Sequence, residues 1–299
     1  MPDDGRRRLA PQRTGRVVLR IALTGADGFT GRHFTEAAGR AGHEVLCIRS
    51  DLTDALAIAA EARAIEVDAV VHLAAISFVG YENERAFYDV NLFGTLNLLD
   101  AMASAGQKLR SVLLASSANV YGNSAHSPIA ETQVPSPVNH YAMSKVAMEV
   151  MARARFNQLP LVITRPFNYT GHGQSGEFVI PKLVDHFRRR ARTVALGNLH
   201  VQREYNDVRF VCEAYLRLLE CDAEEPVFNV CTGTTYDFNS VLALLRELTG
   251  HDIEVEVDAK LVRANEVHRL CGDPSRLARA VGDVPAPGLE ETLRWMLSA

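Results

Sequence analysis

The chain has 299 residues, of which 47% are hydrophobic, and a formal net charge of -4 at pH 7. This length allows one large hydrophobic core, or one large and one small lobe. The weakly acidic net charge disfavours nucleic acid as a partner. The sequence contains no run of about 18 apolar residues, so we expect no membrane span. The five cysteines are widely spaced without a Cys-x-x-Cys pair, so we expect no metal site or disulfide framework and a cytoplasmic location.

Most of the chain is predicted to alternate between strands and helices. Residues 1–16 lack the apolar segment of a signal peptide, and we expect a disordered arm there. Strands are expected at 17–23, 44–48, 69–73, 111–115 and 161–164, and helices from the glycine turn to about 39, at 54–64, from 82 to about 105, and at 139–157. This alternation predicts a doubly wound parallel sheet, with ligands at the carboxyl ends of its strands.

A glycine-rich turn, residues 24–31, joins the first strand to the first helix. Gly25 permits a tight turn, and Gly31 lets the helix pack closely. Gly28 allows a pyrophosphate to approach the helix N-terminus, where free N–H groups and the helix dipole favour anions. The strand–turn–helix context predicts a dinucleotide site, although the glycines alone could form a simple turn.

Tyr141 and Lys145 are four residues apart, so on a helix they share one face. A nearby ammonium favours the phenolate, and we therefore expect Lys145 to lower the pKa of Tyr141. A phenol tuned in this way can give or take a proton at a substrate oxygen. The alternative is a solvated helix face without a catalytic role.

Seven motifs together resemble the extended short-chain dehydrogenase/reductase family of nucleotide-sugar enzymes, over about residues 17–297. They are Thr24-Gly25-x-x-Gly28-Phe29-x-Gly31, Asp51-Leu52-x-Asp54, His72-Leu73-Ala74-Ala75, Asn91-x-x-Gly94-Thr95, Ser116-Ser117-Ala118-Asn119-Val120-Tyr121-Gly122, Tyr141-x-x-x-Lys145 and Arg165-Pro166-Phe167-Asn168. The resemblance implies a Rossmann-type domain of about seven strands in residues 17–165, to which elements around 204–235 return. Residues 166–299 would mainly form a small C-terminal α/β lobe that binds a nucleotide sugar.

The same resemblance implies a catalytic set of Ser117, Tyr141 and Lys145, with Ser116 as a rival for the serine role. The implied cofactor residues are Gly25, Gly28, Phe29, Gly31, Arg49, Asp51, Leu52, Leu73, Ala74, Ala75, Asn91, Tyr141, Lys145 and Pro166. Arg49 with Ser50 after the second strand favours NADPH, with NADH possible. Asn91 is either an anchor near the site or a surface amide, and His72 is expected to be a hydrogen-bonded core histidine.

The second half resembles the GDP-sugar branch of the family through residues 196–208, 263–267 and 272–277. Arg203 and Arg263 would then hold the diphosphate, because a guanidinium group binds two phosphate oxygens at once. Glu266 would accept hydrogen bonds from the ribose hydroxyls. An ordinary surface Arg/Glu pair is the alternative. The implied substrate residues are Ser117, Asn119, Asn168, Val179, Lys182, Asn198, Arg203, Arg263 and Glu266.

Two departures from relatives narrow the expected reaction. Dehydratases carry a Glu where this chain has Asn119, and epimerising relatives carry Cys and His where it has Ala118 and Phe178. Without these proton-moving groups, the chemistry left to the site is hydride transfer to the sugar with protonation by Tyr141. The resemblance thus implies a reductase of a nucleotide-linked 4-keto-6-deoxyhexose, foremost GDP-4-dehydro-6-deoxy-D-mannose, giving GDP-D-rhamnose.

The alternatives are a 4-epimerase, a 4-keto reductase for a dTDP- or UDP-linked sugar, and a non-catalytic dinucleotide-binding protein. The two helices expected at 82–105 and 139–157 carry more apolar residues than one sheet face needs. By resemblance to family members, we expect them to form a homodimer interface.

Overall fold

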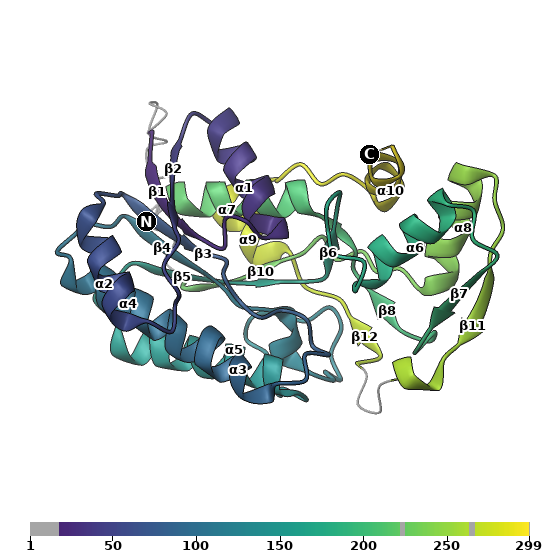
Figure 1. Cartoon of the computed structure of the whole chain (residues 1–299), viewed down its shortest axis with the longest axis horizontal. Helices are drawn as coiled ribbons and strands as arrows, with labels where there is room; N and C mark the ends of the chain where they lie inside the picture. Colours follow the sequence, from purple (N-terminus) through teal and green to yellow (C-terminus); the bar gives the residue numbers. More distant parts are fainter. Residues whose placement is uncertain (1–17, 222–224, 263–266, 299) are drawn as a thin grey trace, which may run out of the picture.

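The structure is a computed structural model that describes residues 18–221, 225–262 and 267–298. The expected arm, residues 1–16, lies outside this range. A larger lobe contains a sheet between two layers of helices, and a smaller α/β lobe lies beside it (Figure 1).

The larger lobe is built on a parallel sheet in the order β10-β5-β4-β3-β1-β2. Its strands are β1 (Arg20–Thr24), β2 (Glu44–Ile48), β3 (Ala69–His72), β4 (Ser111–Ala115), β5 (Leu161–Pro166) and β10 (Val227–Val230). The central strands are apolar and buried, as expected for a parallel sheet covered on both faces. The connections reverse direction between β1 and β3, which opens a crevice at the strand ends there.

Helices cover both faces of this sheet (Figure 1). One face carries α1 (Phe29–Arg40), α7 (Val208–Glu220) and α9 (Ser275–Val281), and the other carries α2 (Ala55–Ala64), α4 (Thr95–Ser104) and α5 (His140–Arg155). Each layer has its own hydrophobic core. The predicted Rossmann-type, doubly wound α/β fold is confirmed.

The described sheet has six strands, one fewer than the expected number. Only residues 49–54 separate β2 from α2, whereas a parallel crossover needs about a dozen residues or more. The chain therefore passes from β2 through α2 to β3, and β2 is left as the edge strand. Arg49 and the Asp51-Leu52 pair lie in this short connection.

The long helix expected at 82–105 contains a change of pitch. It consists of α3 (Glu84–Tyr88), a π-helical turn η1 (Asp89–Gly94) and α4. Such turns frequently occur at functional sites. Here the wide turn carries Asn91, whose exposed fraction is 0%.

The smaller lobe has its own apolar core between helices and a parallel strand pair. Its elements are α6 (Val179–Arg188), β7 (Thr193–Leu196), α8 (Phe238–Thr249), β11 (Glu254–Val257) and α10 (Leu289–Leu297). Short pairs lie between the lobes: β6 (Tyr169–Thr170) with β9 (Asn206–Asp207), and β8 (Gln202–Arg203) with β12 (Arg269–Leu270). Two 3-10 turns complete the list, η2 (Ala118–Tyr121) and η3 (Ala259–Leu261).

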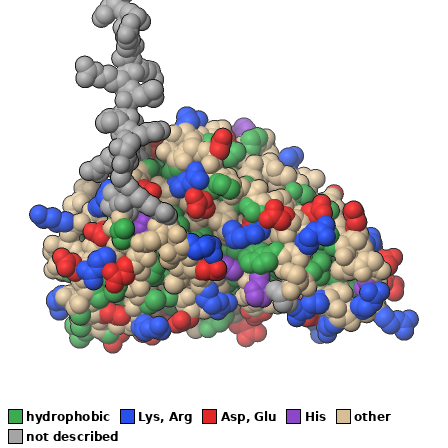
Figure 2. Space-filling view, turned by 90° about the horizontal axis from the view of Figure 1, so that it is seen from above, with side chains coloured by type: hydrophobic (Ala, Val, Ile, Leu, Met, Phe, Trp, Pro, Cys, Tyr) green, Lys and Arg blue, Asp and Glu red, His purple; other side chains and the backbone are tan. Residues whose placement is uncertain are grey.

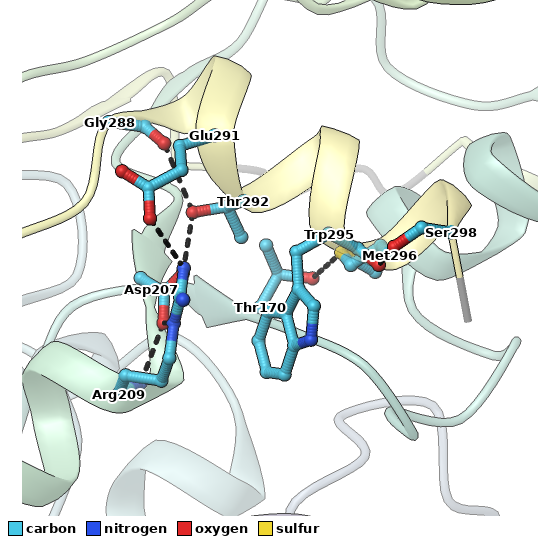
Figure 3. A network of polar contacts seen from close by, with 9 residues as sticks. All are labelled: Thr170, Asp207, Arg209, Gly288, Glu291, Thr292, Trp295, Met296 and Ser298. Atoms are coloured by element: carbon cyan, nitrogen blue, oxygen red, sulfur yellow. Dashed lines mark hydrogen bonds and ion pairs between the residues drawn. The ribbon is translucent and has the colours of Figure 1, made fainter.

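Helix α10 ties the two lobes together (Figure 3). Its apolar face packs in the core of the smaller lobe. The Thr292 hydroxyl donates to Asp207 at 2.7 Å, and Arg209 bridges Asp207 at 2.8 Å and Glu291 at 3.2 Å. The Arg209 guanidinium also lies over the Trp295 ring, 4.5 Å from its centroid. These contacts fix how the lobes face each other.

Later elements return to the larger lobe. Helix α7 packs on α1, β10 pairs with β5, and α9 packs against α7 and β10. We therefore propose that the larger lobe consists of residues 18–165 with α7, β10 and α9. The remainder would form the sugar-binding lobe, as expected from about residue 166 onward.

The surface offers no sign of a concentrated basic region on the face that Figure 2 shows, where acidic and basic side chains are interspersed. Among the described residues, no helix is long and apolar enough to cross a membrane. Within the same residues, no group of three or more His, Cys, Asp or Glu side chains could hold a metal ion.

Candidate active site

A cavity of about 680 Å³ lies between the lobes, at the carboxyl ends of β1, β3, β4 and β5. It brings together predicted residues that are far apart in the chain. They are Gly25, Gly28, Phe29, Gly31, Leu73, Ala75, Ser117, Asn119, Tyr141, Lys145, Pro166, Asn168, Val179, Lys182, Asn198 and Arg203. The strand-end location is where a doubly wound sheet binds its ligands.

The glycine turn forms one end of the cavity. Gly25 has a φ of +73°, and a Cβ on it would lie 2.7 Å from the Ala74 nitrogen. A Cβ on Gly31 would lie 2.0 Å from the Gly25 carbonyl oxygen, so no side chain fits there. Gly28 caps α1 without a side-chain hydrogen bond, which leaves N–H groups of the first helical turn available to an anion. The turn fits the diphosphate of a dinucleotide.

Ser117 and Tyr141 meet across the cavity floor, where both are less than 10% exposed: 6% and 7%. The Ser117 oxygen accepts hydrogen bonds from the backbone and side-chain nitrogens of Asn119, both at 3.2 Å. It also shares a hydrogen bond with the Tyr141 hydroxyl. Because Asn119 supplies the donors, the proton of Ser117 is free to point at Tyr141 or at a substrate oxygen.

The electrostatics of Tyr141 differ from the prediction. Burial raises its pKa, and the hydrogen bond with Ser117 only partly opposes this. The expectation that Lys145 lowers this pKa is therefore wrong for this structure. The Tyr141 ring packs edge-on against Phe87 at 6.0 Å, and the Lys145 ammonium donates instead to the Ala115 carbonyl at 2.8 Å. The phenol keeps its proton at neutral pH, which suits a proton donor.

Lys145 is itself strongly perturbed. Burial lowers its pKa to about 8, and the negative charge of Glu149 acts in the opposite direction. The ammonium is thus mostly charged at neutral pH but titrates only slightly above it.

Ser116 differs from Ser117 in the surroundings of its hydroxyl. Its hydroxyl donates to a buried oxygen of Glu149 at 2.5 Å. That bond turns the hydroxyl toward the protein interior. Ser117 is therefore the serine whose hydroxyl is available in the cavity.

Asn91 lies behind the site and is fully hydrogen-bonded. Its oxygen accepts from the Ile76 nitrogen at 2.9 Å, and its amide donates to the Ile76 carbonyl at 3.0 Å and to Ser144 at 3.1 Å. The reading of Asn91 as a surface amide is wrong. The side chain anchors the loop after β3 to the helix that carries Tyr141.

His72 is a satisfied core histidine, as predicted. Its ring nitrogens lie 2.7 Å from the Thr24 hydroxyl and 2.8 Å from the Thr95 hydroxyl. Burial, with a further effect of the Lys145 charge, lowers its pKa to about 3. His72 is neutral at physiological pH and lies outside the cavity lining.

Some predicted cofactor residues do not line the cavity: Arg49, Asp51, Leu52, Ala74 and Asn91. Arg49 is exposed and lies 3.4 Å from Asp27 of the glycine turn. Ala74 packs against Gly25, and Leu52 packs against Gly94. Asp51 binds the hydroxyl and nitrogen of Thr53, both at 2.8 Å.

The smaller lobe contributes the opposite wall. Lys182 donates to the Ala195 carbonyl at 2.6 Å. Arg203 is only 7% exposed, and its guanidinium donates to backbone carbonyls, including that of Gln202 at 2.9 Å. Asn168, Val179 and Asn198 also line this wall. The predicted Arg263 and Glu266 lie outside the described residues.

An apolar part of the lining was not predicted. Ile76, Phe78 and Val79 follow β3, and Phe78 packs edge-on against Phe178 of the smaller lobe at 6.1 Å. Other lining residues that were not predicted include the polar Thr30, Ser77, Gln174 and Glu177 and the aromatic Tyr205 and Phe238. The first group continues the His72-Leu73-Ala74-Ala75 motif at a strand end, so strand position is a signal that could have identified it.

The three positions that depart from relatives all face this cavity. Ala118 and Phe178 contribute hydrocarbon, and Asn119 contributes an amide that binds Ser117. None of these groups can shuttle a proton at neutral pH. These three residues therefore do not replace the acid or base that dehydratases and epimerising relatives carry at the same positions.

Comparisons with known proteins agree with this geometry. The family described as GDP-mannose 4,6 dehydratase matches residues 46–296. GDP-6-deoxy-D-talose 4-dehydrogenase of Aggregatibacter actinomycetemcomitans is 32% identical over 274 residues, which is 89% of this chain and 92% of that protein. GDP-6-deoxy-D-mannose reductase of Pseudomonas aeruginosa is 32% identical over 297 residues, or 94% of this chain and 97% of that protein.

A solved structure, that of RMD from Pseudomonas aeruginosa complexed with NADPH, has a TM-score of 0.86 and 31% identity. It covers 94% of this chain and 98% of that one. These matches extend over both lobes and over the cavity between them. The chain therefore belongs to the GDP-mannose 4,6-dehydratase family, within the extended short-chain dehydrogenase/reductase enzymes of nucleotide-sugar metabolism.

Proposed function

We propose that this protein reduces GDP-4-dehydro-6-deoxy-D-mannose to GDP-D-rhamnose, using NADPH. One observation carries the proposal: the cavity contains Ser117, Tyr141 and Lys145, while Ala118, Asn119 and Phe178 occupy the positions of the proton-moving groups in dehydratases and epimerising relatives. Without a proton-moving group at these three positions, the site can still complete a ketone reduction through Tyr141.

The dinucleotide would lie along the glycine turn. Its diphosphate fits the N-terminus of α1 beyond Gly28, and Lys145 would hold the nicotinamide ribose. Arg49, exposed beside the glycine turn, would bind the additional phosphate that distinguishes NADPH from NADH. When bound, the reduced nicotinamide supplies the hydride for C4 of the sugar. A relative described as complexed with NADPH supports this cofactor.

The protein side of the reaction is proton donation and charge stabilisation. Tyr141 keeps its proton because burial raises its pKa, and it would transfer this proton to the alkoxide oxygen that forms at C4. The free proton of Ser117 would form a second hydrogen bond to that oxygen. Both donors are held before the reaction begins, so negative charge develops among fixed dipoles.

The nucleotide sugar would be held by the smaller lobe and the strand ends opposite it. We assign Ser117, Asn119, Asn168, Val179, Lys182, Asn198 and Arg203 to this site, together with Arg263 and Glu266. Both 32%-identical relatives have names that specify GDP sugars, which supports GDP over dTDP or UDP. A 4-epimerase and a dTDP- or UDP-sugar reductase remain the competing functions.

A second product follows from the relative named for 6-deoxy-D-talose. Talose and mannose differ only in the configuration at C4. The same residues could therefore give either product, depending on which face of the ketone meets the cofactor. Nuclear magnetic resonance of the product separates the two, because the C4 proton is axial in one sugar and equatorial in the other.

The proposal includes a cytoplasmic homodimer. Exposed apolar side chains cluster on η1 and α5: Phe93 is 56% exposed, Met143 44%, Val150 51% and Met151 40%. Their burial by a second copy would remove apolar surface from water. A reducing compartment accords with the five free cysteines.

The test is a substrate panel with the purified protein. NADPH oxidation is followed with GDP-, dTDP- and UDP-linked 4-keto-6-deoxy sugars, and with NADH in place of NADPH. We expect the GDP sugar and NADPH to give the highest kcat/KM. Turnover of a 4-hydroxy sugar by protein that retains NAD through purification would instead identify an epimerase.

A further inference from the structure

Helix α5 presents three residues along one face to the end of β4. Tyr141, Lys145 and Glu149 are spaced by four, so they lie one above another. They contact residues 115–117 at the end of β4. Tyr141 bonds Ser117, Lys145 donates to the carbonyl of Ala115, and Glu149 accepts from the hydroxyl of Ser116. The third of these α5 residues has no part in the mechanism described so far.

The Glu149 carboxylate is buried, with 1% of its side chain exposed, and both of its oxygens are bound. One oxygen accepts from Ser116 at 2.5 Å and from the Arg165 Nε at 3.0 Å, and the other accepts from the Arg165 Nη2 at 2.6 Å. A buried carboxylate needs partners of this kind, because an unpaired charge in the interior is strongly unfavourable. An ion pair with Glu149 would be enough to neutralise Arg165. The Glu149 oxygen that accepts from the Arg165 Nε also accepts from Ser116, the neighbour of Ser117.

Glu149 does not line the cavity, whereas Ser116, Ser117, Tyr141 and Lys145 do. Any effect of Glu149 on the reaction must therefore pass through these side chains. Its hydrogen bond fixes Ser116, and the following residue is Ser117. A misplacement of a reacting group by about 1 Å can cost on the order of 10²-fold in rate.

The charge of Glu149 also acts on Lys145. Burial lowers the pKa of Lys145 to about 8, and Glu149 opposes that effect. The other titratable groups that interact with or adjoin Lys145 are His72 on β3, which is neutral, and Tyr141 on α5, which keeps its proton. Of these groups, Glu149 supplies the negative charge, and Arg165 on β5 is held against it.

We propose that Glu149 is a positioning residue of this active site: its carboxylate fixes Ser116, and thereby Ser117, from the same face of α5 that carries Tyr141 and Lys145. Three residues of α5 thus organise the end of β4, two of them in the cavity and one behind it. Only the kinetic part of this inference rests on the proposed reductase function.

The kinetic experiment uses Glu149→Gln in the full chain. We expect kcat to fall about 10²-fold, with the KM for the GDP sugar changed less than about threefold, because most of the assigned sugar contacts lie on the smaller lobe. The alkaline limb of the plot of kcat against pH should move to lower pH, because Lys145 loses its proton at lower pH in this variant. Ser116→Ala should lower kcat without moving that limb.

The second readout needs no activity. The chain has four lysines, Lys108, Lys145, Lys182 and Lys260, so carbon-13 lysine labelling gives few signals, and Lys145→Met identifies the one that matters. In the wild type, this signal should titrate near pH 8. In Glu149→Gln its pKa should fall by roughly one unit, because the stabilising anion is gone.

Removing Glu149 alone leaves Arg165 buried without its counter-ion, and the variant could fail to fold. The double variant Glu149→Gln with Arg165→Met removes both charges. Its Lys145 pKa should stay below the wild-type value, as in Glu149→Gln. Glu131→Gln is the matched control. Its carboxylate is also buried and paired, 3.4 Å from Arg276, and it accepts from the Asn229 nitrogen at 2.8 Å.

The control should lose stability but keep the wild-type kcat and Lys145 titration. The inference is overturned if the Glu149 variants behave like the control in both readouts. If the wild type does not reduce the GDP sugar, the proposed function fails, and the lysine titration still decides the role of Glu149. An unchanged Lys145 pKa in the double variant would then reject that role.

Discussion

The ammonium nitrogen of Lys145 donates a hydrogen bond to the carbonyl oxygen of Ala115 at 2.8 Å. Ala115 ends β4, and Lys145 lies in α5, so this bond joins the sheet edge to the helix that carries Tyr141. It holds a cation where burial disfavours the charge. The site thus keeps a charged group in place at the expense of stability, a compromise often found in enzymes.

Lys145→Met should therefore stabilise the fold while removing activity. The folded-state pKa is about 8 against an ordinary 10.5, so at neutral pH the buried charge is unfavourable. Allowing for the lost hydrogen bond, we expect a gain of about 2 kcal/mol in the free energy of unfolding. Urea denaturation at neutral pH measures it, and a variant less stable than the wild type would contradict the account.

The same group gives a pH dependence of defined sign. Between about pH 8 and 10.5 the unfolded chain binds more protons at Lys145 than the folded chain does. Stability from this residue therefore rises with pH across that window. The advantage of Lys145→Met should shrink over the same range in denaturation curves.

Tyr141→Phe removes the proposed proton donor but keeps the ring that packs on Phe87. We expect kcat to fall by about 10²–10⁴-fold, with a Kd for NADPH within about twofold of the wild type, since most cofactor contacts remain. Fluorescence titration and steady-state kinetics measure the two quantities. Wild-type kcat in this variant would exclude Tyr141 as the donor.

Gly31→Ala should damage the cofactor site. Its Cβ would lie 2.0 Å from the Gly25 carbonyl oxygen, so the turn must open, and NADPH binding should be lost. Gly39→Ala in the same helix is the control, because a Cβ there meets no atom within 4 Å. That change should stabilise the protein by about 1 kcal/mol through helix propensity. Equal NADPH affinity in both variants would contradict the role of the turn.

Arg49→Ala should weaken NADPH binding selectively. A charge-assisted bond to the ribose phosphate contributes about 1.5–3 kcal/mol, so we expect a roughly 10- to 100-fold higher Kd for NADPH. The Kd for NADH should not change. Arg40→Ala, which removes an exposed arginine paired with Glu36, serves as the control. A parallel loss of affinity for both cofactors would assign Arg49 another role.

The proposed dimer predicts a surface effect. Phe93→Glu with Val150→Glu places charges in the apolar cluster on η1 and α5 and should give monomers. Leu56→Glu changes an apolar side chain that is 84% exposed on α2 and should leave the dimer intact. Light scattering distinguishes these masses, and a dimeric double variant would place the interface elsewhere.

Sequence patterns predicted the fold well because each strand and helix is locally specified. The short apolar run at 111–115 and the glycine turn before α1 appear where expected. The strand count differed because it was taken from resemblance, whereas the brief connection after Ile48 leaves no room for another crossover. The π-helical turn around Asn91 also escaped prediction, since its stability comes from tertiary contacts of the buried amide.

The site was predicted in its parts but not in its electrostatics. The spacing of Tyr141 and Lys145 predicted that they share a helix face, and both line the cavity. Spacing carries no information on burial, however, and burial decides the direction of both pKa shifts. Likewise, nothing local identifies Glu149 as the partner of Ser116, because that contact depends on how α5 packs on β4.

The most direct test of the central claim follows a labelled hydride. The protein is incubated with GDP-4-dehydro-6-deoxy-D-mannose and NADPH that carries deuterium at the transferable position, and the product is examined by mass spectrometry and nuclear magnetic resonance. We expect one deuterium per product molecule, at C4 of the sugar, and with Tyr141→Phe the same labelled product forming about 10²–10⁴-fold more slowly. A product without deuterium at C4 would contradict direct reduction at this site.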